Sequence, residues 1–551
     1  MDTRFYRRKK SRWVFLPGLI LLAALILQAC APAATATSAP PTSAPAATQA
    51  PAATEAPQVT QPEAATEVPT EASGEMMGGT LRVAMQPIVQ IDPAFISSDA
   101  EVLVANHVYD YLVDVDPQNQ IVPRLAKDWT MSDDGLTYTF MLEEGVTFHD
   151  GNPLSAADVV WTFDRLRDPA ADLPTSGLYE NITGIEATGD LEVTFTLAAP
   201  NPFFLYDLSD NHALILKAGT DNADTVFNGT GPFKVVNYIP EDRVVMEANP
   251  DYFVEGEPHL SGLEIIFFND ETASVDALRS GQVDLVMRMS IDLYQSLENE
   301  ANITRVDIPT NGFDLVRLRS DRAPGNDPNV IQAFKLATDR EAIFQLVQQS
   351  YGGLGYDTPI GPLYTQYFNP EFAPPPRDVE AARQLLTDAG YPDGLEMTLH
   401  VPDTGGRPDL AVVLQNQWAE AGINVDVSVE PESVYYGDNG WLEVDLGITG
   451  WGSRPYPQFY LNVMLTCDAI WNESHYCNET FDELVNTAGT TLDEAERVDA
   501  YNQIQQILAE EGPIIIPYFF AQVAAINNQF DNFALKAFAG RTDFRQVTYT
   551  P

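Results

Sequence analysis

The chain has 551 residues, with 79 acidic and 30 basic side chains and a formal net charge of −49. A surface of this sign repels phosphate backbones, so nucleic acid is a poor partner. The length and the 45% share of hydrophobic residues are enough for two or three lobes rather than a single core.

The first 30 residues have the charge and hydropathy order of a bacterial secretory signal peptide. Six basic side chains are followed by an apolar run of 15 residues, WVFLPGLILLAALIL, which is shorter than the roughly 20 residues of a membrane-spanning helix. The run leads into Leu-Gln-Ala-Cys, which is similar to the lipobox of bacterial lipoproteins, where the peptide is cut before a cysteine that is then lipidated. We predict a signal peptide over residues 1–30 and a lipid anchor on Cys30. An uncleaved N-terminal anchor is the alternative.

Residues 31–77 are rich in Ala, Pro and Thr and contain no aromatic side chain. Such a segment cannot bury a core, so we predict a disordered tether. A flexible coil of about 45 residues spans roughly 40 Å, enough to clear a membrane surface. No second long apolar run follows, and we expect the rest of the chain to lie outside the cytoplasm.

Strands and helices alternate along the remaining chain, which is typical of an α/β fold. Residues 80–85 predict a first strand and residues 99–113 a helix. Ser155 and Asp158 form a capping box, so a second helix is expected to begin there. The strict alternation of apolar and polar side chains over residues 191–197 predicts a half-buried strand.

Later helices are marked by residues at their ends. Asp327, followed by a proline at the first helical position, predicts a helix start. Gly390 and Gly422 are expected to end two helices in the left-handed conformation, and an alternating strand follows each of them. A long helix over residues 492–511 precedes the apolar stretch PIIIPYFF, which predicts a buried strand over residues 513–520.

After the lipobox, the only cysteines are Cys467 and Cys477. Outside the cytoplasm, an even pair this close in sequence indicates a disulfide. Closing this loop stabilises the fold by roughly 2.8 kcal/mol on the loop-entropy model. The alternative is a two-thiol metal site, for which His475 alone is a poor third ligand.

Sequence motifs for catalysis or metal binding are absent. The six histidines never fall within one helical turn of one another, so the chain has no zinc-protease motif, and it has neither a nucleophile elbow nor a phosphate-binding loop. His149 and Asp150 could suggest a metal site, but a turn before the capped helix is the preferred interpretation. We predict no enzyme activity, no metal and no cofactor, although a catalytic carboxylate pair could hide among so many acids.

Five segments, taken together, resemble successive motifs of the solute-binding protein family 5 of ABC importers, which includes oligopeptide-, dipeptide- and nickel-binding lipoproteins. The resemblance runs in order from about residue 78 to the C-terminus. The segments are GVTFHDGNPLSAADVVWTFDRL, GTGPFKVVNY with ANPDYF, DPNVIQAFKLATDREAI, AARQLLTDAGYPDG and GITGWGSRPYPQFYLN.

The resemblance implies a type II periplasmic-binding-protein fold in three lobes, with the ligand held in a cleft between two of them. The lobes are expected at residues 78–122, 226–308 and 513–551 (lobe I), 123–225 (lobe II, an insert) and 309–512 (lobe III). It also implies a receptor that captures a short peptide or peptide-like acid and delivers it to a membrane permease with ATPase subunits. We expect a monomer. An oligosaccharide receptor, favoured by clustered aromatic residues, and a surface hydrolase are the alternatives.

In peptide-binding relatives the segment similar to residues 450–462 lines the cleft, and an aspartate there holds the peptide's α-amino group. Arg454 stands at that position here, which favours an anionic or polar group of the ligand. The candidate ligand contacts are Gly450, Trp451, Gly452, Ser453 and Arg454, then Ser97, Ser98 and Asp99 by resemblance, and Arg317 and Arg319, which face the same side of a predicted strand. Two alternatives stay open: Arg454 pairs with Asp445 or Asp438 and braces the turn, and the other two arginines are edge-strand charges.

Overall fold

The computed structural model of this chain describes residues 78–171, 173, 176–437 and 440–551. The predicted signal peptide, the lipobox cysteine Cys30 and the tether lie outside these residues. No helix in the described part of the chain has the length and apolar character needed to cross a bilayer.

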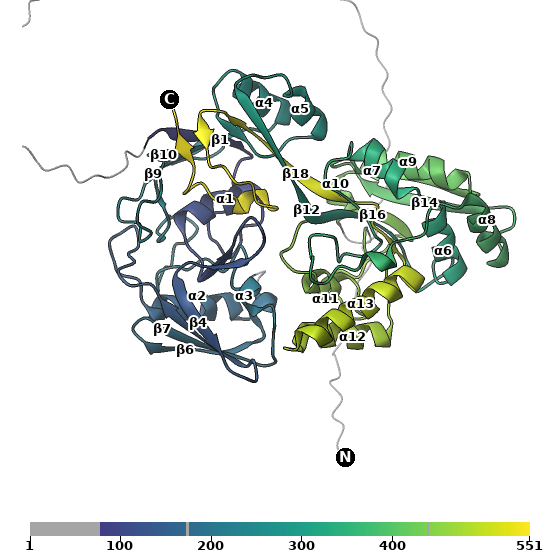
Figure 1. Cartoon of the computed structure of the whole chain (residues 1–551), viewed down its shortest axis with the longest axis horizontal. Coiled ribbons are helices and arrows are strands. Elements are labelled where there is room, and N and C mark those ends of the chain that lie inside the picture. The colour runs from purple at the N-terminus through teal and green to yellow at the C-terminus, as the bar shows by residue number, and fades with distance from the viewer. Residues whose placement is uncertain (1–77, 172, 174–175, 438–439) are drawn as a thin grey trace, which may run out of the picture. The chain divides into compact units, whose positions relative to one another are not determined.

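A mixed twelve-stranded sheet runs through the described residues (Figure 1). Its main path has the order β15 (Ile423–Glu430), β14 (Leu395–Pro402), β16 (Leu446–Trp451), β12 (Ile303–Leu318), β18 (Tyr518–Asn527), β11 (Leu285–Val286), β1 (Thr80–Met85), β10 (Gly262–Phe267), β9 (Arg243–Ala248) and β8 (Phe233–Ile239). Two short strands join its side, β13 (Gly353–Leu354) on β18 and β17 (Ile514–Ile515) on β12.

The remaining strands form three smaller sheets. They are the antiparallel sheet β4 (Ala126–Met131), β5 (Thr137–Leu142), β7 (Glu192–Leu197) and β6 (Ile182–Gly189), and the two-stranded sheets of β2 (Val113–Val115) with β3 (Ile121–Pro123) and of β19 (Phe530–Asp531) with β20 (Thr548–Tyr549).

Helices pack against these sheets in groups (Figure 1). Those before residue 300 are α1 (Asp99–Val108), α2 (Ala156–Arg167), α3 (Phe204–Asp207), α4 (Glu271–Arg279) and α5 (Ile291–Ser296). Those after it are α6 (Pro328–Ala337), α7 (Arg340–Val347), α8 (Val379–Asp388), α9 (Arg407–Ala419), α10 (Glu432–Tyr435), α11 (Gln458–Met464), α12 (Glu479–Thr490) and α13 (Glu494–Glu511). Short 3-10 helices lie at Ser176–Tyr179, Pro370–Phe372 and Ala539–Arg541.

The long strand β12 connects the hydrophobic clusters of the structure. It contributes Val306 to the cluster around β1 and the small sheet, Val316 to the cluster under α6 and α9, Phe313 to the cluster of α11–α13, and Ile303 to the cluster of α4 and α5. Its register on β18 shifts between Pro309 and Phe313. Residues on either side of this shift therefore belong to different packing units, and the shift itself lies beside the cavity described below. The three-lobe boundaries stay a prediction.

The local signals were good guides to where helices begin and end. Asp158 accepts a hydrogen bond from the Ser155 amide (2.8 Å), and Asp327 caps α6 by accepting from the Asn329 amide (2.9 Å). Gly390 and Gly422 have φ of +93° and +85°, so these helix ends are confirmed.

Two predicted elements were too long. The predicted helix over residues 99–113 ends at Val108, and the next residue is extended. The buried carboxylate of Asp110 accepts hydrogen bonds from Thr230 and Tyr252, and these contacts hold the chain in its non-helical course. The predicted strand over residues 513–520 is divided into β17 and the start of β18. Proline at position 517 has no amide hydrogen to donate to a ladder.

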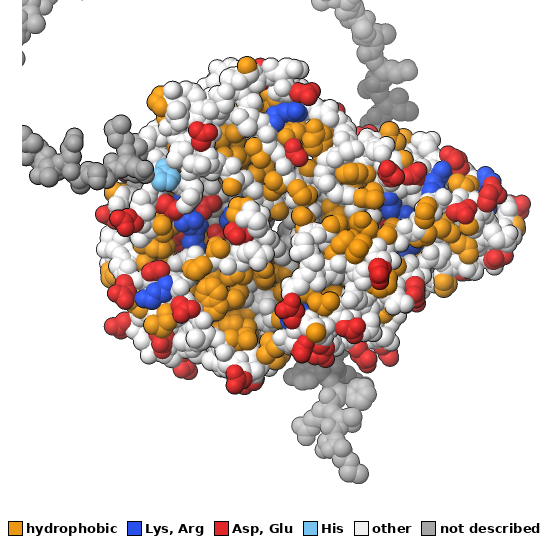
Figure 2. Space-filling view, in the orientation of Figure 1, with side chains coloured by type: hydrophobic (Ala, Val, Ile, Leu, Met, Phe, Trp, Pro, Cys, Tyr) orange, Lys and Arg blue, Asp and Glu red, His pale blue; other side chains and the backbone are white. Residues whose placement is uncertain are grey.

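Acidic side chains are spread over the margins of the face shown in Figure 2, whereas its middle is largely hydrophobic or uncharged. Most of the acidic charge that this face presents therefore lies at its periphery (Figure 2). Charged side chains placed inside the molecule need a separate explanation.

Candidate ligand-binding site

A cavity of about 760 Å³ is the candidate site. Its volume lies in the range of roughly 300–1,000 Å³ that is typical of small-molecule pockets. We call wall A the lining residues within 115–119, 177–181 and 199–211, and wall B those within 453–463 and 489–490. Helix α3 belongs to wall A and helix α11 to wall B (Figure 1). Segments 308–311 and 535–541 also line the cavity.

Strand β16 leads the chain into wall B, and a buried carboxylate holds this strand in place. Glu473 is 1% exposed and accepts hydrogen bonds from Thr449 Oγ1 (2.7 Å) and Trp451 Nε1 (3.2 Å). The fully buried Arg317 donates from Nε to the same carboxylate (3.1 Å). Burial raises the pKa of Glu473, and the Arg317 charge and the hydrogen bonds oppose this shift. The cluster fixes the end of β16 directly before the lining residues.

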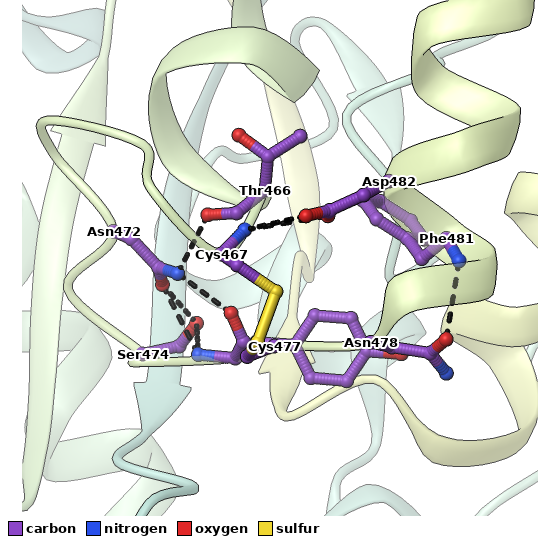
Figure 3. The surroundings of a disulfide bond; sticks show 9 residues. Thr466, Cys467, Asn472, Ser474, Cys477, Asn478, Phe481 and Asp482 are labelled. Atoms are coloured by element: carbon purple, nitrogen blue, oxygen red, sulfur yellow. Dashed lines mark hydrogen bonds between the residues drawn. A yellow bond between two sulfur atoms is a disulfide. The ribbon is translucent and has the colours of Figure 1, made fainter. Parts of the chain in front are cut away.

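A disulfide closes the loop that carries Glu473 (Figure 3). Cys467 and Cys477 are joined, and the Cys467 amide donates to the Asp482 carboxylate of α12 (3.2 Å). Inside the loop, the Asn472 side chain donates to the carbonyls of Thr466 (3.0 Å) and Tyr476 (2.7 Å). The loop is thus tied at its ends and across its middle, which limits the positions that the Glu473 carboxylate can take.

The backbone of the turn after β16 is held by hydrogen bonds. The Arg454 carbonyl accepts from Tyr364 Oη (2.7 Å) and from Asn311 Nδ2 (3.3 Å). The Asn311 amide donates to Ser453 Oγ (3.1 Å), and Tyr460 Oη donates to the Gly452 carbonyl (2.7 Å). These hydrogen bonds hold the backbone of the turn in place, and they fix the point from which the arginine side chain projects.

Arg454 is the lining cation that lacks an acidic partner among the described residues. Its guanidinium donates to the Ser453 carbonyl (3.1 Å) and lies 4.5 Å from the centre of the Phe459 ring. Asp445, one predicted partner, pairs with Arg322 instead, and Asp438, the other, lies outside the described residues.

The other two lining cations are already committed. Lys536 and Arg541 are 7% and 5% exposed, and both pair with the buried Asp114. Both are bound to a carboxylate of the protein, whereas Arg454 has no acidic partner among the described residues and has donors to offer to a solute.

Wall A presents two aspartates. Asp207 accepts hydrogen bonds from Asn201 Nδ2 (2.7 Å) and from the hydroxyl of Tyr456, which comes from wall B. The Tyr456 ring also stacks on Phe203, with ring centres 4.8 Å apart, so the two walls are in contact here. Burial raises the pKa of Asp207 to about 7, in spite of these hydrogen bonds.

Asp210 is held differently. Its Oδ1 accepts from the His212 ring (2.5 Å) and from the His212 amide (3.1 Å). Burial alone would raise the pKa of Asp210, but the charge of His212 and its hydrogen bonds, together with the charge of Arg454, bring the pKa below its ordinary value. Asp210 is therefore a carboxylate at neutral pH.

The structure brings only Ser453 and Arg454 of the predicted contacts into the cavity lining. The others lie outside it: Gly450, Trp451, Gly452, Ser97, Ser98, Asp99, Arg317 and Arg319. Ser98 caps α1 by accepting from the Glu101 amide (3.3 Å), and Asp99 accepts from the Gly540 amide (3.2 Å). A Cβ atom at position 450 would overlap the Arg407 guanidinium, which would have to move to make room for it.

Arg317 on β12 and Arg319 directly after this strand form ion pairs with acidic residues of the protein. Arg317 is fully buried with Glu473, and Arg319 pairs with Asp321 (2.7 Å) and Glu443 (2.7 Å). The sequence analysis predicted none of these ion pairs. The same reasoning missed the wall A aspartates, because nothing in the segment NPFFLYDLSDNH marks it as a ligand-binding loop.

Comparison with known proteins decides the family. The model of the bacterial extracellular solute-binding proteins, family 5, matches residues 120–472, which is more than half of the chain. The chain belongs to this family. The predicted family is therefore confirmed, and family membership places the described part outside the cytoplasm.

Relatives cover most of this family member. It is 30% identical to the "Probable di/tripeptide-binding protein 5" of Pseudomonas aeruginosa (strain UCBPP-PA14), over 80% of this chain and 90% of that protein. It is 29% identical to "Di/tripeptide-binding protein 1" of the same strain, over 72% of this chain and 80% of that protein. These relatives are binding proteins rather than enzymes.

Solved structures show the fold. The periplasmic binding protein DppA from Helicobacter pylori, in complex with the peptide STSA, matches with a TM-score of 0.73 at 25% identity, covering 87% of this chain and 99% of that one. The oligopeptide-binding protein AppA from Bacillus subtilis, in complex with a nonapeptide, matches in fold with a TM-score of 0.72 at 24% identity, covering 87% and 100%. The predicted type II periplasmic-binding-protein fold is confirmed.

Proposed function

We propose that this family member is the extracytoplasmic receptor of an ABC importer and captures short peptides or peptide-like acids. The observation that carries the proposal is Arg454, a guanidinium that lines the cavity without an acidic partner among the described residues. A guanidinium offers a planar fork of donors that matches the two oxygens of a carboxylate. The relatives described as di/tripeptide-binding proteins, and the neighbour solved with a bound peptide, support the same ligand class.

Capture requires no bond to be broken. A ligand that contacts both walls favours the arrangement in which they are close, by as much as its affinity differs between the two arrangements. We propose that a permease with ATPase subunits recognises the loaded form. We also propose that the receptor acts as a monomer, attached to the cell membrane through a lipid on Cys30.

The alternatives receive less support. The relatives named above are described as peptide-binding proteins, so an oligosaccharide ligand is not favoured.

Among the predicted contacts, Ser453 stays a proposed ligand contact together with Arg454, because both line the cavity.

The proposal is tested by calorimetry with a mixed library of di- and tripeptides and with the same library amidated at the C-terminus. Native mass spectrometry of the purified protein first identifies any solute that occupies the cavity. We expect free peptides to bind, and Arg454→Ala to weaken their binding by about 2–5 kcal/mol, or roughly 30-fold to several thousand-fold. Arg322→Ala is the matched control, since this arginine lies outside the cavity lining and pairs with Asp445. Failure of any peptide to bind, or undiminished affinity in Arg454→Ala, would contradict the proposal.

A further inference from the structure

Two neighbouring aromatic residues of wall A belong to different hydrophobic clusters. Phe204 of α3 is buried against Tyr138 and Phe195 of the four-stranded sheet, with ring centres 4.8 and 5.6 Å apart. Phe203, the residue before it, is buried in the cluster of α11–α13, whose other buried members among the described residues come from positions 313–519. Helix α3 is therefore anchored on both sides of the cavity.

The turn before α11 surrounds this helix from wall B. Besides its ring contact with Phe203 and its hydrogen bond to Asp207, Tyr456 packs against Tyr206, with ring centres 5.6 Å apart. A second hydrogen bond joins the walls nearby, from the Asn119 side chain to the Pro455 carbonyl. The carbonyl of the same asparagine accepts from Tyr206 Oη (3.2 Å). We call this set of contacts the latch.

The latch consists of protein groups alone, so it acts in the absence of a solute. Its residues line the cavity from both walls, and any movement that parts the walls here breaks it. The burial of one phenylalanine side chain favours the close arrangement by at least about 10-fold. The hydrogen bonds that cross between the walls add to this preference.

Asp207 is the acidic group of the latch. Its carboxyl accepts from Asn201 and Tyr456, and it forms no ion pair with a described residue. The titratable and charged groups around it are the phenols Tyr138, Tyr179 and Tyr456, the carboxylate Asp210, and the cations His212 and Arg454, which act on Asp210. An ionised Asp207 therefore meets the like charge of Asp210, whereas parting the walls gives it access to water.

We infer that the latch holds the two walls together without a solute, and that a proton on Asp207 strengthens it. In the close arrangement the pKa of Asp207 is raised to about 7, because the carboxyl is buried. Once the walls part, water lowers this pKa toward its ordinary value. The parted form therefore loses the proton first, and the latch weakens as pH rises from about 4 to 7. The inference adds to the proposed function a control of cavity opening, whichever solute is bound.

The test measures the distance between the walls in the full chain, after native mass spectrometry has shown it to be free of solute. Nitroxide labels are attached after Glu186→Cys on β6 and Asn486→Cys on α12, both at exposed positions, and double electron–electron resonance gives the distance distribution. Cys30→Ala keeps the label off position 30, while Cys467 and Cys477 stay in their disulfide. We expect the shorter distance to dominate at about pH 5.5, and the ratio of close to parted molecules to fall at least about 10-fold by about pH 8.

Three substitutions in the latch separate its parts. Tyr456→Phe keeps the ring contact and removes the hydroxyl, so the ratio of close to parted molecules should fall by about 5- to 10-fold at the lower pH. Phe203→Ala removes the buried ring, and a fall of at least about 10-fold is expected. Asp207→Asn keeps an acceptor for Tyr456 but cannot ionise, so its ratio should be the same at both pH values.

Tyr476→Phe is the matched control. It also removes a tyrosine hydroxyl that donates to a carboxylate, that of Glu511 (3.0 Å), but neither residue lines the cavity. Its distance distribution should equal that of the unsubstituted protein. Circular dichroism checks that every variant is folded.

Two sets of results would overturn the inference. Walls that are already parted at the lower pH, or an unchanged distribution in both Tyr456→Phe and Phe203→Ala, would show that there is no latch. Equal distributions at the two pH values in the unsubstituted protein, or a pH effect that persists in Asp207→Asn, would remove the role of the proton. No peptide is present in this test, so a failure of peptides to bind contradicts the proposed function alone.

Discussion

Removing the carboxylate of Glu473 is expected to destabilise the fold strongly, although this residue is far from any predicted helix or strand signal. In Glu473→Ala the fully buried Arg317 keeps its charge and loses its acidic partner. Breaking a buried ion pair from one side costs about 3–5 kcal/mol. Thr449 and Trp451 also lose their acceptor, and each unpaired donor adds to the loss. We therefore expect the upper end of this range.

The assay is equilibrium unfolding in urea, followed by tryptophan fluorescence and by circular dichroism. The two probes must coincide before a free energy of unfolding is compared. Glu443→Ala is the matched control, because Glu443 pairs with Arg319 but is 53% exposed, and solvent screens an ion pair whose carboxylate is exposed, so little stability should be lost. The double variant Arg317→Met with Glu473→Leu is expected to lose less than Glu473→Ala, since it leaves no unpaired buried charge. A loss below about 1 kcal/mol in Glu473→Ala would refute this reasoning.

Three further predictions concern a loop, a carboxyl group and the anchor. Replacing Cys467 and Cys477 with serine should lower the free energy of unfolding by about 2–3 kcal/mol on the loop-entropy model; an unfolding midpoint that reductant does not change would contradict this. The pKa of Asp207 is raised to about 7 in the folded protein. As pH rises from about 4 to 7, the unfolded chain loses this proton while the folded protein keeps it, so the free energy of unfolding falls. Asp207→Asn should therefore gain stability relative to the parent across this window in urea unfolding at several pH values, and a constant difference would count against it. Cys30→Ala should move the protein from the membrane fraction to the soluble fraction, whereas retention would support the uncleaved anchor.

Sequence reasoning succeeded where the interactions are local. A helix cap joins residues three positions apart, as Ser155 and Asp158 do, and a glycine after a helix has its own backbone preference. Both are visible in a short window. The family motifs also occur in the expected order along the chain. The fold class could therefore be predicted from them, although identity to a listed relative is only about 30%.

The site depends on contacts that no short window contains. Arg317 and Glu473 are 156 positions apart, and Tyr456 and Asp207 are 249 apart. Whether an arginine on a strand faces a cavity or a buried acid is decided by the strand register, here of β12 on β16, and both faces give the same alternating pattern. With 79 acidic residues in the chain, the sequence offers far too many candidates to single out the aspartates of wall A.

The large negative charge of the chain also constrains what its cavity can accept. At physiological ionic strength the field of the outer carboxylates is screened over about 8 Å, so it acts on a solute close to the molecular surface. A solute with a net negative charge is repelled there, whereas a zwitterion has no net charge and is not. Inside the cavity, Arg454 acts on a bound carboxylate over hydrogen-bond distances, where its charge has a larger effect than that of the distant outer carboxylates. An acidic exterior combined with a lining cation that has no acidic partner among the described residues therefore favours ligands whose carboxylate is balanced by a positive charge, as in a free peptide, over anions that could use Arg454 alone.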